Sequence, residues 1–92
     1  MIRKFRHKGL ERFFRTGSKA GIQPQHAEKL RLMLTTLEHA VRSDDMKVPG
    51  WQFHQLTKDL AGFYSVSVSG NWRLIFRFEK TDAMDVNYVD YH

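Results

Sequence analysis

The chain has 92 residues, which gives room for one compact domain with its own core, and it lacks cysteine, which excludes disulfide bridges and thiolate metal sites. Residues 1–46 carry ten Lys and Arg against five Asp and Glu, whereas residues 47–92 carry five of each. This clustering of positive charge favours a polyanion such as nucleic acid as partner, although a solvated helix face or an acidic protein partner would explain it as well.

The first half of the chain is expected to be largely helical, after a short edge strand at residues 2–5. In residues 7–16 the apolar side chains recur at helical spacing, and Gly17 suits the left-handed conformation that ends many helices. The side chains on this apolar face are Leu10, Phe13 and Phe14.

A second, longer helix is expected from Pro24, which suits a first helical turn, to about Arg42. Apolar residues recur every three or four positions along it and form one stripe, which is expected to face the core. The stripe consists of Leu30, Met33, Leu34, Leu37, Ala40 and Val41. The histidines of the helical half stand among polar neighbours and are expected on the surface; they are His7, His26 and His39.

The second half changes to a period of two, which is typical of half-buried strands. Strands are expected around residues 52–56, 64–69, 72–78 and 84–91, with a two-residue hairpin signal at Gly70-Asn71 and a turn at residues 80–83. One face of the third of these strands is expected to carry Trp72, Leu74, Phe76 and Phe78, and the other face Arg73, Ile75 and Arg77. In the last strand, one face is expected to carry Met84, Val86, Tyr88 and Asp90.

Together these elements predict a β-α-α-β-β-β order and an α+β fold, with two helices packed on one face of a mainly antiparallel, twisted sheet. A single domain of residues 1–92 is expected, and the other face of the sheet would be free for a ligand. No segment is apolar over 18 residues, and the N-terminus lacks the apolar stretch of a signal peptide. A cytoplasmic protein that does not contact membranes is therefore expected.

Common catalytic signatures are missing from the sequence. It has no phosphate-binding glycine loop and no H-E-x-x-H pair, and its five histidines lack metal-ligand spacing, so a bound metal is not expected. The unusual feature is the ending Asp90-Tyr91-His92, which places a carboxylate, a phenol and an imidazole where chain ends are normally chemically quiet. This ending is either a polar strand tip or part of a site.

The run Asp59–Val68, the segment Asn71–Phe76 and the ending Asp90-Tyr91-His92 together resemble the HigB branch of the RelE/ParE toxins. The opening Ile2–Phe5 and the spacing of the helices are also similar, so the resemblance covers essentially the whole chain. It implies a RelE/ParE-like fold and a ribosome-dependent endoribonuclease of a type II toxin–antitoxin pair, which cuts mRNA without metal or cofactor. It also implies a cognate helix-turn-helix antitoxin similar to HigA, with operator DNA bound only through the antitoxin complex.

The resemblance assigns roles to individual residues. In such an enzyme the RNA 2′-hydroxyl is the nucleophile, so the protein must deprotonate it, stabilise charge on the phosphate and protonate the leaving oxygen. The resemblance implies that His54 and His92 supply the acid and the base, and that Arg73 holds the phosphate. Asp90 would orient a histidine or take part in proton transfer, and Tyr91 would stack on a base or position the strand. Further substrate contacts are expected from Lys58, Asn71 and Arg77.

One turn departs from the family pattern. Where the family has lysine followed by glycine, this chain has Thr57 followed by Lys58, whose flexible point charge is expected to replace the family lysine. Two other functions are left open, a toxin that inhibits DNA gyrase by binding, like the ParE members, and a plain nucleic-acid-binding module. His54 and His92 favour the nuclease, because an inhibitor that acts by binding does not need paired imidazoles.

Overall fold

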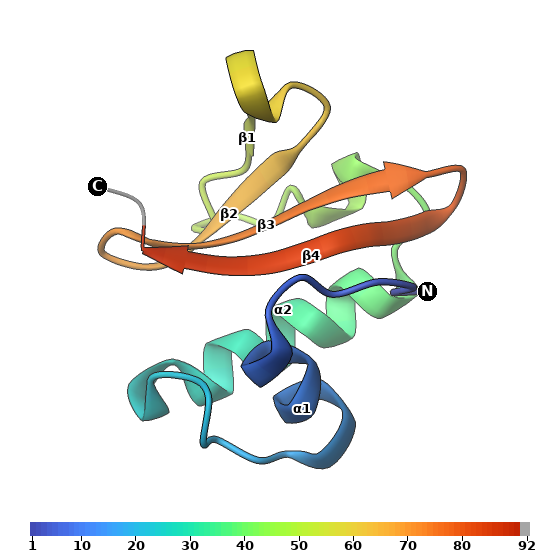
Figure 1. The fold of residues 1–92 in the computed structure, drawn as a ribbon. Helices are drawn as coiled ribbons and strands as arrows, with labels where there is room; N and C mark the ends of the chain where they lie inside the picture. The colour runs from blue at the N-terminus through green and yellow to red at the C-terminus, as the bar shows by residue number, and fades with distance from the viewer. Residues whose placement is uncertain (91–92) are drawn as a thin grey trace.

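The computed structural model describes residues 1–90 and has an α+β fold, in which two helices lie against one face of a four-stranded antiparallel sheet (Figure 1). The helices are α1 (Lys8–Thr16) and α2 (Ala27–His39). The strands are β1 (His54–Gln55), β2 (Tyr64–Ser69), β3 (Trp72–Glu79) and β4 (Asp82–Asp90), which are neighbours in that order. Short 3-10 turns occur at η1 (Pro24–His26), η2 (Ser43–Met46) and η3 (Lys58–Leu60). The predicted fold class is confirmed, and neither helix in this part of the chain is long and apolar enough to cross a membrane.

The N-terminal segment lies along the outer edge of β4. It forms two isolated parallel bridges, Ile2 with Ala83 and Phe5 with Val86, and Arg6 N donates a hydrogen bond of 2.8 Å to Val86 O. The expected edge strand is therefore present as a pairing, although it is too short and irregular to form a regular strand. Because it pairs with β4, it covers an edge that would otherwise expose unpaired backbone groups.

Helix α1 begins and ends close to its predicted bounds. Gly17 takes a left-handed φ of 81° and donates its N–H to Phe13 O, which closes the helix. Leu10 and Phe13 are buried in the core. Gly9 and Gly21 touch backbone to backbone, since a Cβ built on Gly9 would lie 2.7 Å from Gly21 Cα. The start of α1 and the connector to α2 thus pack at a distance that only glycine allows.

Helix α2 carries the apolar stripe but is shorter than predicted. It ends at His39, because Ala40 is extended with ψ of 145°. Val41 therefore leaves the stripe and is 53% exposed, so the expectation that it belongs to the core is wrong. The other positions of the stripe are buried as predicted: Leu30, Met33, Leu34, Leu37 and Ala40.

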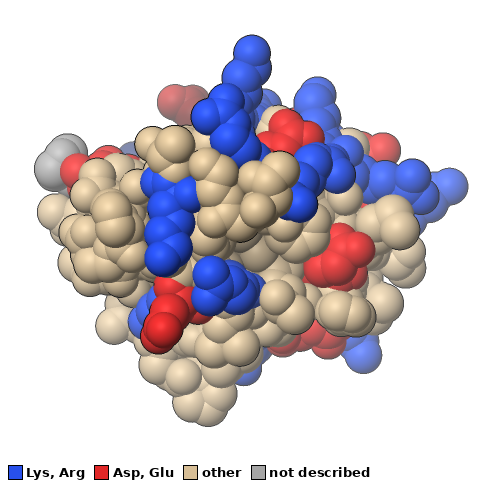
Figure 2. Space-filling model, turned by 90° about the horizontal axis from the view of Figure 1, so that it is seen from below, with Lys and Arg blue, Asp and Glu red and all other residues tan. Residues whose placement is uncertain are grey.

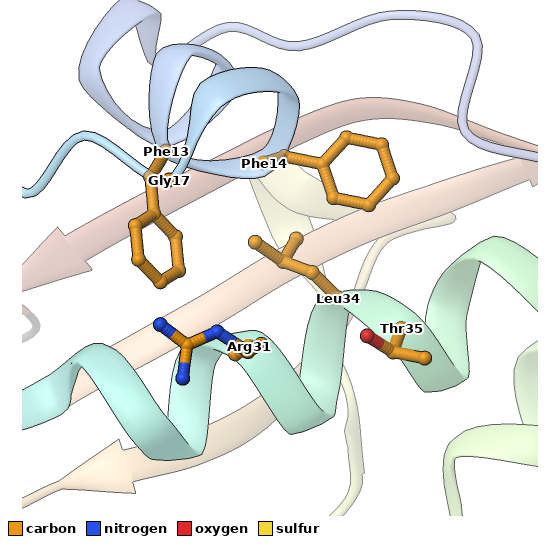
Figure 3. Close-up of a pocket in the computed structure, with 6 residues that line it drawn as sticks. All are labelled: Phe13, Phe14, Gly17, Arg31, Leu34 and Thr35. Carbon is orange, nitrogen blue, oxygen red and sulfur yellow. The ribbon is translucent and has the colours of Figure 1, made fainter.

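The two helices meet across a pocket of about 200 Å³ (Figure 3). The rings of Phe13 and Phe14 enter it from α1, and Arg31 of α2 holds its guanidinium carbon 5.6 Å from the centre of the Phe13 ring. This pocket lies among the helices, on the opposite side of the sheet from the residues predicted to be catalytic on β1 and β3.

Strand β4 contains a bulge that changes the faces of its first residues. Its register against β3 shifts between Ile75 and Arg77, where Asp85 adopts a left-handed φ of 52° and β4 gains one residue. Ala83, expected in a turn, consequently lies in the core and is fully buried. Met84 pairs with Arg77 and shares its face, so the prediction that Met84 lies on one face with Val86 and Tyr88 is wrong.

Strand β1 is shorter than the predicted strand at residues 52–56. Left-handed backbone occurs on both sides of it, at Gln52 with φ of 51° and at Lys58 with φ of 57°, and interrupts the extended conformation. The two remaining residues, His54 and Gln55, pair with Ser65 and Tyr64 of β2.

The two faces of the sheet differ in composition. The face toward the helices carries the core side chains Val66, Val68, Leu74, Phe76, Val86 and Tyr88. We call the opposite side the polar face; its residues include Ser65, Ser67, Arg73, Ile75, Arg77 and Asn87. The predicted free face exists but is partly covered, since Ser65 and Ile75 are buried. The Phe63 ring, just before β2, meets the Arg6 guanidinium of the N-terminal segment, 5.7 Å from the ring centre.

Candidate active site

His54 is exposed at the edge of the polar face. It is the first member of a row of paired residues that crosses the sheet through Ser65 and Ile75 to Asn87. Side chains of residues that pair across antiparallel strands share one face, so the imidazole belongs to the polar face. The position is therefore open to a substrate that lies over this side of the sheet.

A hollow of about 420 Å³ adjoins His54 and is lined by residues 54–60. Thr57 and Lys58 both line it, and Lys58 is exposed. The backbone of Lys58 is left-handed, with φ of 57°, a conformation in which glycine is at ease and other residues are strained. This geometry accounts for the glycine of the family pattern at this position, and it places the Lys58 chain on the same hollow as His54.

Arg73 also lies on the polar face. It pairs with Ser67 of β2, two residues after Ser65, which is the partner of His54, so Arg73 belongs to the next row of paired residues on this face. Its Nη1 donates hydrogen bonds to Gly70 O (2.6 Å) and Ser67 Oγ (3.2 Å), which tie the guanidinium to the β2–β3 turn beside the exposed Asn71. Standard sheet spacing puts the Cα atoms of His54 and Arg73 roughly 12 Å apart. Two extended side chains can span that distance around one phosphodiester group.

Arg77 is held by acidic partners on the same face. Its Nε donates to Asp85 Oδ2 at 2.7 Å and its Nη1 to Glu79 Oε2 at 3.1 Å. The hydrogen bond to Asp85 raises the pKa of Arg77, and the same bond holds the pKa of the Asp85 carboxyl below its ordinary value. Lys4 Nζ and Arg6 Nε approach the other oxygen of Asp85, at 3.6 and 3.7 Å. Arg77 thus belongs to a network of charges rather than standing alone.

The predicted catalytic ending lies at the tip of β4. Asp90, the last residue of the strand, is exposed and pairs with Trp72. Trp72 faces the helices and stacks on Tyr88 with 4.6 Å between ring centres, so the register assigns Asp90 to the helix side of the strand end and not to the polar face. Tyr91 and His92 lie outside the described residues, and their roles stay predictions.

A buried cluster of rings under the strand end was not predicted. His26, expected on the surface, is only 4% exposed, and its Nδ1 lies 2.6 Å from Tyr88 Oη. The His26 ring also meets Trp72 edge-on at 5.7 Å, and the His7 ring lies 5.4 Å from that of Tyr88. Burial lowers the pKa of His26 and of His7, which favours their neutral forms. The cluster ties both helices to the end of the sheet that carries Arg73.

The outcome for the histidines has a simple physical reason. His26 stands four residues before Leu30, so η1 continues the apolar stripe of α2 and turns His26 inward. This spacing was the signal in the sequence that could have identified it. His7 is half-buried because it caps α1, where its Nδ1 accepts the Leu10 N–H at 2.9 Å. His39 is exposed as predicted.

The basic residues on the side of the helices do not form one continuous patch. On the side that carries the helices, Lys and Arg side chains are spread out with acidic side chains between them (Figure 2). Several basic residues have acidic neighbours, as in the pair of Arg15 with Glu11 at 3.0 Å. Within residues 1–90, no group of three or more histidine or acidic side chains is arranged to hold a metal ion. The total charge therefore says less about ligand binding than the local arrangement on the polar face.

Comparison with known proteins shows the family of the chain. A family model described as RelE-like toxin of type II toxin-antitoxin system HigB matches residues 3–92. Endoribonuclease HigB of Proteus vulgaris is 34% identical over the full length of both chains. Toxin HigB-1 of Vibrio cholerae serotype O1 is 31% identical over all of this chain and 98% of its own. The chain belongs to the RelE-like HigB toxins of type II toxin–antitoxin systems.

Proposed function

We propose that this toxin is a ribosome-dependent endoribonuclease that cleaves mRNA with the RNA 2′-hydroxyl as nucleophile. The Proteus vulgaris relative carries the name endoribonuclease. The observation that carries the proposal is the placement of an exposed imidazole, His54, one row from the guanidinium of Arg73 on the same face of the sheet. An acid–base group beside a phosphate-binding group is what cleavage by an internal hydroxyl needs.

In the proposed reaction, one histidine of the pair His54 and His92 takes the proton of the 2′-hydroxyl. The 2′-oxygen attacks phosphorus, the bond to the 5′-oxygen breaks, and the other histidine protonates that oxygen, which leaves a 2′,3′-cyclic phosphate and a 5′-hydroxyl. Arg73 stabilises the added negative charge with its planar fork of donors. Asp90 orients a histidine, and Tyr91 stacks on a base at the cut. None of these steps uses a metal or a cofactor.

Three further residues are proposed to contact the RNA. Lys58 supports the phosphate from the hollow beside His54, and Asn71 donates from the exposed β2–β3 turn. Arg77 contributes through its network with Asp85, whose carboxylate limits how far the guanidinium can move. These positions lie on the same side of the sheet or at its turns, where one strand of RNA could reach them.

The family implies an antitoxin partner for the toxin. We propose that this partner is a helix-turn-helix protein similar to HigA and that the pair contacts operator DNA only through the antitoxin. We further propose that the toxin works in the cytoplasm, where it meets ribosomes and translated messages. The basic excess of residues 1–46 would assist its association with RNA.

Purified toxin added to ribosomes that carry a defined message tests the proposal. Cuts within the message are expected, and His54→Gln should lower the cleavage rate by roughly 10²–10⁴. Because His54 is exposed, the unfolding transition of this variant should match that of the wild type. Inhibition of gyrase supercoiling without cleavage would favour the ParE-like alternative, and RNA binding without either effect would indicate a plain binding module.

A further inference from the structure

A group of charged and aromatic side chains crosses the polar face beside the row that contains His54. Its members come from the N-terminal segment, the residue before β2, β3 and the bulge of β4; we call it the cationic row, and it consists of Lys4, Arg6, Phe63, Arg77 and Asp85. The Arg6 guanidinium lies 5.7 Å from the centre of the Phe63 ring and 3.7 Å from Asp85 Oδ1. Segments far apart in the sequence thus converge here.

The charges of the cationic row are not balanced within it. Arg77 takes one oxygen of Asp85 at 2.7 Å and also bonds Glu79. The other oxygen, Asp85 Oδ1, is buried and accepts no hydrogen bond from the described residues, because Lys4 and Arg6 stay 3.6 and 3.7 Å away. Their side chains are 64% and 56% exposed. The three cations of the row therefore face the carboxylate of Asp85 within it and that of Glu79 beside it. The charged groups of Lys4 and Arg6 keep hydrogen-bond donors for an external anion.

We propose that Lys4, Arg6 and Phe63 form a second RNA contact that grips a phosphate and stacks the adjoining base next to the cleavage site. This inference rests on the proposed function and names where the substrate strand runs. A guanidinium held over an aromatic ring presents donors at its edge that suit a phosphate. Aromatic rings and guanidinium planes are also the surfaces on which unpaired RNA bases stack.

The position of the cationic row gives the path of the bound RNA over the sheet. Phe63 precedes Ser65, the partner of His54, by two residues, which corresponds to about 7 Å along the strand. Arg73 lies on the other side of the His54 row, since it pairs with Ser67. A strand of RNA that follows β2 therefore has the phosphate to be cut between Arg73 and His54, and it meets the pair of Arg6 and Phe63 about 7 Å further along.

The test compares Arg6→Gln with a control, Arg15→Gln, which also removes one exposed arginine but from helix α1. Three RNA probes are used: a dye-labelled single-stranded RNA with 2′-O-methyl groups that cannot be cut, vacant ribosomes, and ribosomes programmed with that RNA. Arg6→Gln should weaken binding on the order of 10-fold and reduce the salt dependence by about 0.7 in log–log slope, the value for one phosphate contact on a single strand. Phe63→Leu should weaken it about 5- to 100-fold through lost stacking.

The arms of the experiment separate the sources of the RNA. An effect with the message in place assigns the contact to mRNA, whereas an equal effect on vacant ribosomes assigns it to ribosomal RNA. Equal affinity and equal salt slope for Arg6→Gln and Arg15→Gln in all arms would overturn the inference. Should Arg6→Gln fail to fold, modification of wild-type arginines by phenylglyoxal gives the answer: bound RNA should protect Arg6 and not Arg15, and equal modification of both would overturn it.

The outcome for this contact is distinguishable from that for the proposed function. Binding that depends on Arg6 without any cleavage of messages would refute the endoribonuclease and keep the contact. Cleavage of messages with binding that does not depend on Arg6 would keep the endoribonuclease and refute the contact.

Discussion

Lys58 allows a test in which stability and activity should change in opposite directions. Its φ of 57° is a left-handed conformation that costs a residue with a Cβ about 1–2 kcal/mol. Glycine removes that strain but gives up about 0.5–1 kcal/mol through its greater freedom in the unfolded chain. Lys58→Gly should therefore raise the free energy of unfolding by up to about 1 kcal/mol. In a chain of 92 residues that corresponds to a rise in Tm of about 4–8 °C at most.

The same substitution removes a positive charge from the hollow beside His54. If Lys58 has taken over the role of the family lysine, the rate of cleavage should fall on the order of 10- to 1,000-fold, as when one charge-stabilising donor is lost. Lys58→Ala is the control, because alanine loses the charge and keeps the strained backbone. It should lose the same activity without the gain in stability.

Single-turnover cleavage on programmed ribosomes and urea unfolding of the same protein samples provide the two measurements. The double variant Thr57→Lys with Lys58→Gly restores the family order of lysine and glycine, and it should recover activity while keeping the added stability. Cleavage by Lys58→Gly at the wild-type rate would refute the role of Lys58, and a lower free energy of unfolding would refute the argument from backbone strain.

Three further predictions concern other parts of the molecule. Replacing His92 by Gln should abolish growth inhibition while changing stability by less than about 1 kcal/mol, because one polar side chain is exchanged for another and no apolar group is lost; full toxicity at equal expression would contradict its catalytic role. Gly9→Ala should lower the free energy of unfolding by about 1–3 kcal/mol despite the better helix propensity of alanine, since its Cβ would lie 2.7 Å from Gly21 Cα; urea unfolding that shows a gain would contradict the close packing. Burial lowers the pKa of His26 and His7, so their contribution to stability is complete above the unfolded value of about 6.5 and decreases as the pH falls below it. Urea unfolding between pH 7.5 and 5 should show this decline, reduced in His26→Gln, and a curve that is flat throughout would contradict it.

Local sequence signals predicted much of the fold because the features concerned are themselves local. Helix α1 with its closing glycine, Gly17, and the two-residue turn at Gly70 depend on spacing and on residues that tolerate positive φ. The end of α2 depends on a side chain that follows the helix, since Asp45 Oδ2 accepts the N–H groups of Val41 and Arg42 at 2.9 and 3.3 Å. Because that carboxylate binds two backbone N–H groups that a longer helix would need, the helix ends, although the helical spacing of apolar residues continues beyond it.

Other features that were missed arise from strand pairing. The bulge of β4 uses Asp85, which is not a residue type that signals a left-handed backbone as glycine does. Its stability comes from Arg77 on the neighbouring strand, which bonds its carboxylate at 2.7 Å. The candidate site has the same origin: register alone places His54 and Arg73 on one face, and only the family resemblance connected them beforehand. Their separation in the sequence gives no periodic signal.

The ring cluster under β4 holds the last described residues of that strand against the helices. Tyr88 is central, because its hydroxyl lies 2.6 Å from the buried His26 Nδ1 while its ring stacks on Trp72 at 4.6 Å. Tyr88→Phe keeps the stacking and leaves His26 unsatisfied, so the free energy of unfolding should fall by about 1–3 kcal/mol. In His26→Leu protein the same change should cost less, because only the Gln23 N–H, which donates to Tyr88 Oη at 3.4 Å, then loses its partner. Tyr64→Phe, in a half-buried tyrosine of β2, serves as the control and should cost less than about 0.5 kcal/mol. Urea unfolding of the four proteins of the cycle measures the coupling, and additive effects would show that the pair does not anchor the strand that ends at Asp90.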